Sequence, residues 1–271
     1  MKTHFLLKLL FFILILIIVI PTIFPFVWML ISSFKTNADI ISWPPRFIFS
    51  PNAGNYERVF FEHNFLRFFQ NSSIVALGAV FFSLVIGLPA AYSIARFKQR
   101  KILMMILMAR LMPGISFLLP WFIVFTRLRL IDTFVSLILS HILIVMPVVV
   151  WVMAAYFETI PEEMEASAMV DGATRQQAFL SIILPLSIPG AVTAATLSFI
   201  FSWNNFMFAQ VLSMEQTSTL PLAVFNFLAH AEVDWGGVMA AAVLIVTPAI
   251  FLTMIFQKYV IKGLTVGAVK G

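Results

Sequence analysis

The sequence predicts an all-α membrane protein in which six apolar helices cross the bilayer. Three observations support this fold class. Hydrophobic residues make up 61% of the chain, charged residues make up 11%, and the mean hydropathy is +1.01, which excludes an ordinary soluble domain. The apolar residues gather in runs of about 20, the length that crosses a bilayer. One long polar and amphipathic stretch, residues 161–190, lies between two of those runs.

The apolar runs define the predicted spans. The first run follows a short basic lead and is longer than the apolar core of a signal peptide, so we expect it to stay on the protein. Pro113, Gly114 and Pro120 interrupt the third run, which also holds Arg110. Because no internal repeat divides the chain, we expect one transmembrane domain over residues 1–271. The predicted spans are 9–31, 71–95, 102–125, 136–157, 186–208 and 238–256.

The distribution of Lys and Arg predicts the orientation. With the amino terminus inside, ten of these residues fall on the cytoplasmic side and six outside, mostly in one long loop. Both termini and residues 161–190 are therefore predicted to be cytoplasmic. The net charge of +5 does not indicate nucleic-acid binding, because the basic residues sit at span ends and form no patch.

The residues available for chemistry argue against an enzyme. All twelve Asp and Glu residues lie outside the predicted spans, which gives a proton relay poor support. No phosphate-binding G-x-x-x-x-G-K-[ST] run occurs, cysteine is absent, and the four histidines are far apart in sequence. His141 lies within a span, where a lone histidine more often hydrogen-bonds a neighbouring helix. We expect no bound cofactor or metal, and an energy source outside the chain for any transport.

The polar stretch predicts a helix–turn–helix on the cytoplasmic face. Pro161 suits a first helical turn, and the acids that follow it favour the positive end of the helix dipole. Gly172 stands where a left-handed cap would end this helix at about Val170. Thr174 is a plausible cap for a second helix, with apolar residues at 178, 179, 182 and 183, which Pro185 would end. A small apolar knob is expected at Ala166, Ala168, Met169, Val170 and Ala173.

An interfacial helix lying on lipid is the alternative for this stretch. Such helices carry a basic face toward anionic lipid, whereas this one carries acids. We therefore favour docking to another protein.

The chain resembles the permease subunits of ATP-binding-cassette importers, and more closely their carbohydrate branch. Their signature is E-A-A, three residues, Gly, nine residues, then I-x-L-P. Gly172 and the Ile182–Pro185 run fit this spacing, but Ala166, Ser167 and Ala168 fall on the E-A-A positions. Either Glu165 or Glu163 would then take the role of the family glutamate. Further similar runs are AAYSIARF at 90–97, Trp203–Asn204, Thr219–Leu220–Pro221 and GLTVGAVKG at 263–271.

The resemblance implies a type I importer fold, with residues 161–185 forming the coupling loop that seats in an ATPase subunit. It implies a second homologous permease, two ATP-binding-cassette ATPase subunits that hold ATP and Mg, an extracytoplasmic sugar-binding protein, and a bacterial or archaeal cytoplasmic membrane. The tail at 263–271 would either be disordered or touch the ATPases. The candidate coupling residues are Glu163, Glu165, Ala166, Ala168, Met169, Asp171, Gly172 and Ala173.

A sugar pathway should present amides and aromatic rings near mid-membrane, because hydroxyl groups need hydrogen-bond partners and sugar faces stack on rings. Each candidate also has a simpler role in helix–helix hydrogen bonding or interfacial anchoring. The candidates are Asn71, Ser72, Arg110, Pro113, Trp203, Asn204, Asn205 and Gln210.

The sequence thus predicts a permease subunit of an ATP-driven importer of a sugar or oligosaccharide. Import of a sugar derivative such as glycerol phosphate, or a non-transport membrane scaffold, are the alternatives. The resemblance leaves open which sugar is carried, and whether this chain or its partner contacts it.

Overall fold

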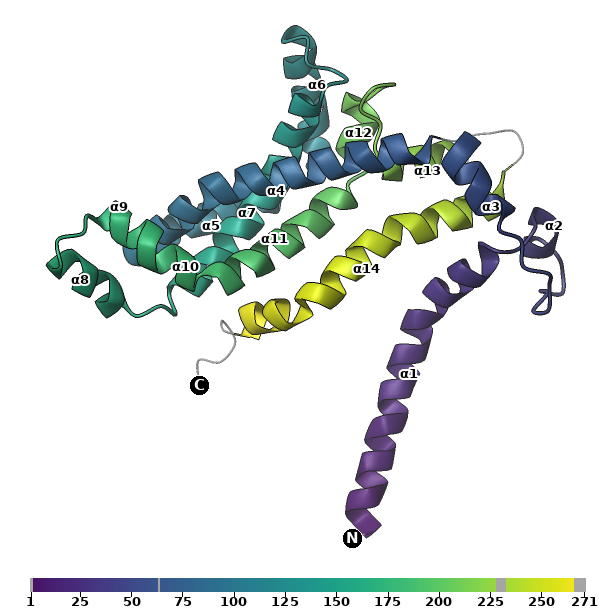
Figure 1. The fold of residues 1–271 in the computed structure, drawn as a ribbon, viewed down its shortest axis with the longest axis horizontal. Coiled ribbons are helices and arrows are strands. Elements are labelled where there is room, and N and C mark those ends of the chain that lie inside the picture. The colour runs from purple at the N-terminus through teal and green to yellow at the C-terminus, as the bar shows by residue number, and fades with distance from the viewer. Residues whose placement is uncertain (1, 63, 228–232, 266–271) are drawn as a thin grey trace. The chain divides into compact units, whose positions relative to one another are not determined.

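The computed structural model describes residues 2–62, 64–227 and 233–265 (Figure 1). Within those ranges all regular secondary structure is helical, and loops and turns join the helices. The chain divides into two compact units. One comprises residues 1–66 and 224–247, and the other comprises residues 67–223 and 248–271. Of the tail at 263–271, residues 263–265 belong to a helix, and the remainder lies outside the described residues.

The first unit is built on a long apolar helix and a polar connection. Asn55 anchors the connection, because its side-chain amide donates to the carbonyl oxygens of Ser33, at 2.7 Å, and Lys35, at 2.9 Å. Arg58 pairs with Asp234 at 3.1 Å. The elements of this unit are α1 (Lys2–Ser32), α2 (Asn37–Ile40), α3 (Gly54–Glu57), the π-helical η1 (Arg58–Glu62) and the first part of α14 (Trp235–Thr265).

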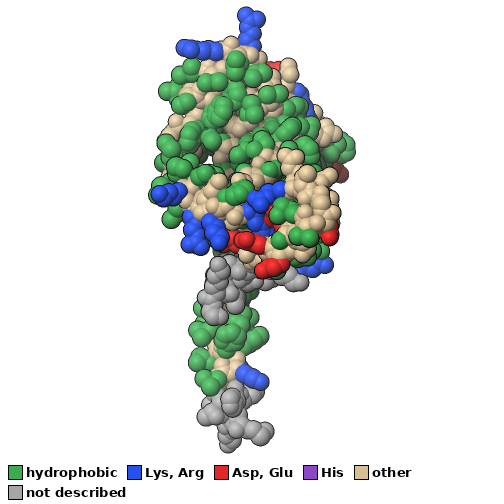
Figure 2. All heavy atoms as spheres, turned by 90° about the vertical axis from the view of Figure 1, so that its left-hand side faces the viewer, with side chains coloured by type: hydrophobic (Ala, Val, Ile, Leu, Met, Phe, Trp, Pro, Cys, Tyr) green, Lys and Arg blue, Asp and Glu red, His purple; other side chains and the backbone are tan. Residues whose placement is uncertain are grey.

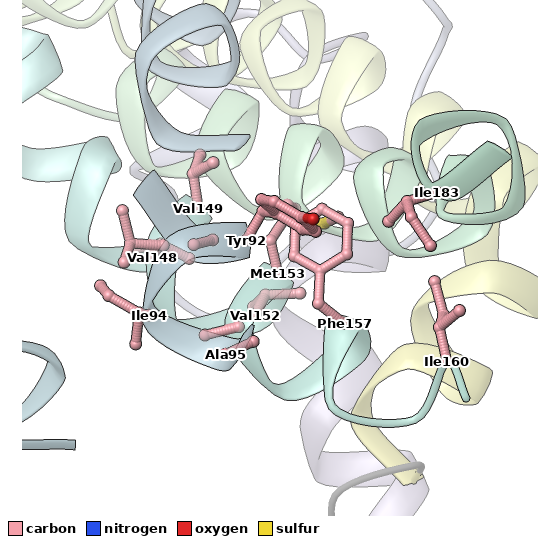
Figure 3. Close-up of a cluster of buried hydrophobic side chains, with 14 residues drawn as sticks. Tyr92, Ile94, Ala95, Val148, Val149, Val152, Met153, Phe157, Ile160 and Ile183 are labelled. Carbon is pink, nitrogen blue, oxygen red and sulfur yellow. The ribbon is translucent and has the colours of Figure 1, made fainter. Parts of the chain in front are cut away.

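The second unit is a bundle in which α4 (Phe65–Arg96) and α11 (Ile188–Trp203) pack on α7 (Phe134–Phe157). Its largest apolar cluster lies toward the ends of these helices, where Tyr92, Met153 and Phe157 converge (Figure 3). The other elements are α5 (Arg100–Arg110), the 3-10 helix η2 (Gly114–Phe117), α6 (Leu118–Arg127), α8 (Glu162–Val170), α9 (Arg175–Ala178), the π-helical η3 (Phe179–Ile183), α10 (Leu184–Leu186), α12 (Met207–Leu212) and the first half of α13 (Leu220–Phe227), whose second half belongs to the first unit.

By length and composition, four helices among the described residues can cross a membrane unaided: α1, α4, α7 and α14. Two bent helix pairs raise the number to six if each counts as one span. The helical, membrane-spanning fold class is thus confirmed, with two of the six predicted spans present only as bent pairs.

The predicted third span, 102–125, is not a continuous helix. α5 ends at Arg110, and the chain resumes as η2 and α6 at an angle of 88°. Pro113 causes this break, since it has no N–H to continue the ladder and disfavours helical geometry in the residue before it.

The predicted fifth span, 186–208, is shorter than expected. α11 ends at Trp203, and three residues separate it from α12. Asn204 and Asn205 occupy that gap, consistent with the preference of asparagine for local hydrogen bonds over a helix interior.

Candidate functional site

The hairpin of residues Glu162–Leu186 begins as predicted with an acid-led helix. α8 follows Pro161 and carries Glu162, Glu163 and Glu165 in its first turn. It ends in a Schellman arrangement, in which Gly172 N–H donates to Met169 O at 3.1 Å and Ala173 N–H donates to Ala168 O at 3.0 Å. Gly172 has φ +94°, so the predicted left-handed turn is confirmed.

The second half of the hairpin starts at the predicted cap. Thr174 Oγ1 accepts from the amide of Gln177, and the Gln177 side chain accepts in return from the amide of Thr174, which completes a capping box. The prediction that Pro185 ends this helix is wrong. The π-helical η3 carries the chain into α10, where Pro185 lies in the first turn and needs no N–H, and the bend of 73° to α11 falls at Ser187.

Most of the candidate coupling residues lie on the exposed face of the hairpin. Acidic and basic side chains gather at this end of the bundle (Figure 2). Val170, at 87% exposed, is the most open of the large apolar side chains of α8. The exposed candidates are Glu163, Ala166, Met169, Asp171 and Gly172, and Ala173 is half-buried.

Glu165 and Ala168 are exceptions, because they are only 4% and 8% exposed. Their placement in an exposed docking surface is therefore corrected. They share the face of α8 that packs on the bundle, where Glu165 accepts hydrogen bonds from Tyr92 and Arg96. A cleft of about 260 Å³ opens beside this contact, lined by Arg96, Glu162, Glu163, Glu165, Ala166, Met169 and Arg175.

A second cavity, of about 440 Å³, lies where the chain breaks between α5 and η2 and between α11 and α12. Arg110, the last residue of α5, and Asn205, between α11 and α12, both line it. The guanidinium of Arg110 lies 4.8 Å from the centre of the Phe201 ring. Apart from Arg110 and Asn205, the residues that line this cavity carry no polar side chain: Ala109, Met112, Gly114, Phe117, Leu143, Ile144, Pro147, Met207 and Phe208. Such a cavity suits a ligand held by a few polar contacts against apolar walls.

The family model described as "Binding-protein-dependent transport system inner membrane component" matches residues 83–266, which include the hairpin and the lining of this cavity. The chain belongs to this family. The predicted place in the inner membrane is thereby confirmed, and the relatives that follow confirm the resemblance to permease subunits of ATP-binding-cassette importers.

Relatives match the chain over most of its length. A probable ABC transporter permease protein, y4oR, of Sinorhizobium fredii is 36% identical over 92% of this chain and 90% of its own. The trehalose/maltose transport system permease protein MalG of Thermococcus litoralis is 33% identical over 92% of each chain. The sulfoquinovosyl glycerol transport system permease protein SmoH of Agrobacterium fabrum is 32% identical over 94% of this chain and 91% of its own.

A crystal structure of a bacterial ABC transporter involved in the import of the acidic polysaccharide alginate contains a chain with the same fold. It matches with a TM-score of 0.75 and 21% identity, over 96% of this chain and 98% of that one. The importer-like fold predicted from the sequence is confirmed by this match.

Apart from Arg110 and Asn205, the residues predicted for the sugar pathway do not line the larger cavity. Asn71 is buried and donates to the carbonyl oxygens of Gln216 and Ser218, at 2.9 Å each. Ser72 is buried and accepts from the amide of Leu220. Trp203 is 2% exposed and stacks on Phe199. These three candidates hold elements together, which agrees with the simpler role weighed for them in helix–helix contacts. Pro113, Asn204 and Gln210 are exposed outside the cavity lining.

Four residues with clear structural roles, three at the hairpin and one at the segment 213–219, were not predicted from the sequence. Tyr92, Arg96 and Arg175 surround Glu165, and Asp132 binds the segment at 213–219. Tyr92 and Arg96 lie four residues apart in the AAYSIARF run, a spacing that places both side chains on one face of a helix. That spacing was the available signal, but it does not identify Glu165 as their partner.

Proposed function

We propose that this chain is the permease subunit of an ATP-driven importer of a sugar or oligosaccharide. The observation that carries the proposal is the hairpin of residues Glu162–Leu186, a rigidly capped turn at the end of the bundle, in a member of the binding-protein-dependent family. Relatives named for trehalose, maltose and diacetylchitobiose transport support a carbohydrate substrate.

The exposed side of the hairpin is the proposed contact with an ATPase subunit. It presents acids beside small apolar side chains, and its shape is defined by Gly172 and by the Thr174 cap. A preorganised surface loses little conformational freedom on binding, which suits an element that must bind and transmit a displacement. The proposed contact residues are Glu163, Ala166, Met169, Asp171, Gly172 and Ala173.

The cavity of about 440 Å³ is the proposed site on the translocation pathway. Broken helices at membrane depth are tolerated where they line a cavity, and they free polar groups for a ligand. Arg110 supplies donors and Asn205 supplies both a donor and an acceptor, while the surrounding rings and methionines offer an apolar wall.

The chain works within a larger assembly in this proposal. A second homologous permease completes the path, two ATPase subunits bind ATP and Mg, and an extracytoplasmic binding protein delivers the sugar. The positions of Lys and Arg support a cytoplasmic hairpin and cytoplasmic termini in a bacterial or archaeal cytoplasmic membrane.

The test is reconstitution in liposomes with the second permease, ATPase and binding protein encoded beside this chain. Labelled maltose, trehalose and diacetylchitobiose are presented from the binding-protein side. Uptake of at least one sugar that requires ATP on the other side is expected. Absence of any ATP-dependent uptake, or neighbouring genes that encode neither a permease nor a sugar-binding protein, would contradict the proposal.

A further inference from the structure

Glu165 is the buried centre of a polar cluster formed by three segments of the chain. The Tyr92 hydroxyl donates to Oε1 at 2.5 Å, and Arg96 Nε donates to Oε2 at 3.0 Å. Arg175 Nε lies 3.4 Å from Oε1. We call Glu165, Tyr92, Arg96 and Arg175 the Glu165 cluster. It joins the last turn of α4, the first turn of α8 and the first turn of α9.

Neighbouring contacts hold the two arginines of the Glu165 cluster in place. Arg96 Nη1 also donates to Ile160 O at 3.0 Å, in the link that precedes α8. The Arg175 guanidinium lies 5.2 Å from the Phe97 ring centre. The two arginines are thus oriented by groups outside the ion pairs, so their geometry does not depend on Glu165 alone.

Two aromatic side chains, Phe157 and Phe179, pack against Tyr92 of the Glu165 cluster. The Tyr92 ring contacts Phe179 of η3 at 4.7 Å and Phe157 of α7 at 5.9 Å between centres. Figure 3 shows Tyr92 and Phe157 together, with Ile183 and Ile160 at the side. The side chains of Arg96 and Glu165 are 7% and 5% exposed, so most of this charge pair is shielded from water, although its edge lines the cleft of about 260 Å³. Separating Arg96 from Glu165 would leave a buried charge without its partner. The energetic cost of this unpaired charge opposes separation of α4 from α8.

We propose that Glu165 is a positioning residue that fixes the hairpin to the end of α4, so that a displacement of the hairpin is passed to the bundle. This inference rests on the proposed function. Glu165 itself touches no ATPase and no sugar in this proposal. The exposed face of α8 makes the contact, and the Glu165 cluster on its opposite face carries the movement onward.

The test measures how accessible the larger cavity is to a labelling reagent while the ATPases hydrolyse ATP. It needs no identified substrate. The chain contains no cysteine, so Met112→Cys introduces one thiol, at a residue that is 53% exposed and lines the larger cavity. The assembled complex is labelled with a membrane-impermeant maleimide, with and without ATP and vanadate. In Met112→Cys alone, the labelling rate is expected to change by about fivefold or more, the lower end of coupling between protein sites.

Glu165→Gln is then added, which removes the charge and keeps the shape. The response is expected to fall below about twofold, a loss of most of the coupling, while the ATPases still co-purify and hydrolyse ATP. Glu158→Gln is the matched control, because it removes an exposed carboxylate that makes no side-chain hydrogen bond or ion pair with the described residues, and it should keep the full response. Arg175→Lys should keep the response better than Arg175→Gln.

An undiminished response in both Glu165→Gln and Arg175→Gln would overturn the inference. Loss of the ATPases from a Glu165→Gln chain that is folded and inserted in the membrane would overturn it as well, since Glu165 would then be a docking residue. If the Glu165→Gln chain does not fold, Arg175→Gln decides, because this side chain is 47% exposed and its replacement disturbs the fold less. Failure of Met112→Cys alone to respond, or to hold an ATPase, would instead count against the proposed function.

Discussion

Asp132 and Thr217 are joined by two hydrogen bonds across 85 residues of sequence. Asp132 Oδ1 accepts from the backbone amide of Thr217 at 3.0 Å and from its hydroxyl at 2.8 Å. The same carboxylate accepts from the amides of Met214, at 2.9 Å, and Gln216, at 3.0 Å. The side chain of Asp132, which follows α6, therefore orders the segment at 213–219. Asn71 also donates to carbonyl oxygens of this segment, and Ser72 accepts from Leu220, the residue that follows it.

This arrangement predicts an acid-sensitive segment. Burial by itself would raise the pKa of Asp132, but the hydrogen bonds from Met214, Gln216 and Thr217 outweigh it and hold the pKa below its ordinary value of 3.8. The stabilisation is therefore complete above the pKa of the unfolded chain and is lost as the pH falls through the lower, folded value. Limited proteolysis of this segment in purified protein should accelerate only below about pH 4.

Asp132→Asn is the matched control for this prediction. Asparagine tolerates the left-handed backbone at this position, where φ is +61°, but its amide does not titrate near this pH. Its proteolysis should be faster than that of the wild type at neutral pH and should not accelerate further in acid. An acid transition of equal size in both proteins would contradict the role of Asp132.

We predict that Gly172 is required because its backbone adopts a left-handed conformation, and not because a larger side chain would lack space there. A Cβ built there would meet no atom within 4 Å, but φ is +94°. Gly172→Val should cost about 1–2 kcal/mol in the turn, whereas Gly172→Asn should cost less because asparagine visits this conformation. We expect the Val variant to lose ATP-driven uptake while the complex still assembles, with the Asn variant closer to wild type. Full uptake by the Val variant would show that the turn is not needed for coupling.

Gly190 is predicted to be required for close packing of α11 on α7. A Cβ at this position would lie 2.5 Å from Tyr156 Cγ. Gly190→Ala should destabilise the protein by about 1–3 kcal/mol through overpacking, measured as a lower unfolding temperature in detergent. Gly114→Ala is the control, since its nearest neighbour would be Met207 Sδ at 3.8 Å. Equal melting of the two variants would refute the close contact.

Arg110 is predicted to act on transport and not on ATP hydrolysis. Hydrogen bonds to a charged donor are worth about 1.5–3 kcal/mol, so Arg110→Gln should lower sugar uptake roughly tenfold or more. Arg127→Gln removes an exposed cation at the end of α6, outside the cavity, and should leave uptake unchanged. A parallel loss in both variants would indicate a general charge effect in place of a role in the cavity.

Local features of the hairpin were predictable because their causes lie within a few residues. The left-handed turn at Gly172 and the cap at Thr174 depend on neighbouring backbone groups, and both were found as predicted. The path beyond the cap was less predictable. Pro185 normally stops a helix, but a π-helical turn before it places it in a first turn, where it is tolerated.

The roles of individual polar residues were less predictable than the elements that carry them. Asn205 and Asn204 are adjacent and chemically identical, yet only Asn205 lines the cavity. Glu165 and Glu163 are both acids of one short helix, yet only Glu165 is buried. In each pair the difference depends on which side faces the bundle, and contacts with distant residues set that orientation.

The sequence by itself determined an all-helical membrane protein, its family, and an acid-led hairpin that turns at Gly172, because composition, span length and capping are properties of short segments. Only the tertiary structure decided that the displaced glutamate faces inward. Tyr92 and Arg96, about 70 residues earlier in the chain, come within hydrogen-bonding distance of Glu165 only when α4 packs beside the hairpin. A buried carboxylate is stable where such partners meet it, so the place of Glu165 is a consequence of packing.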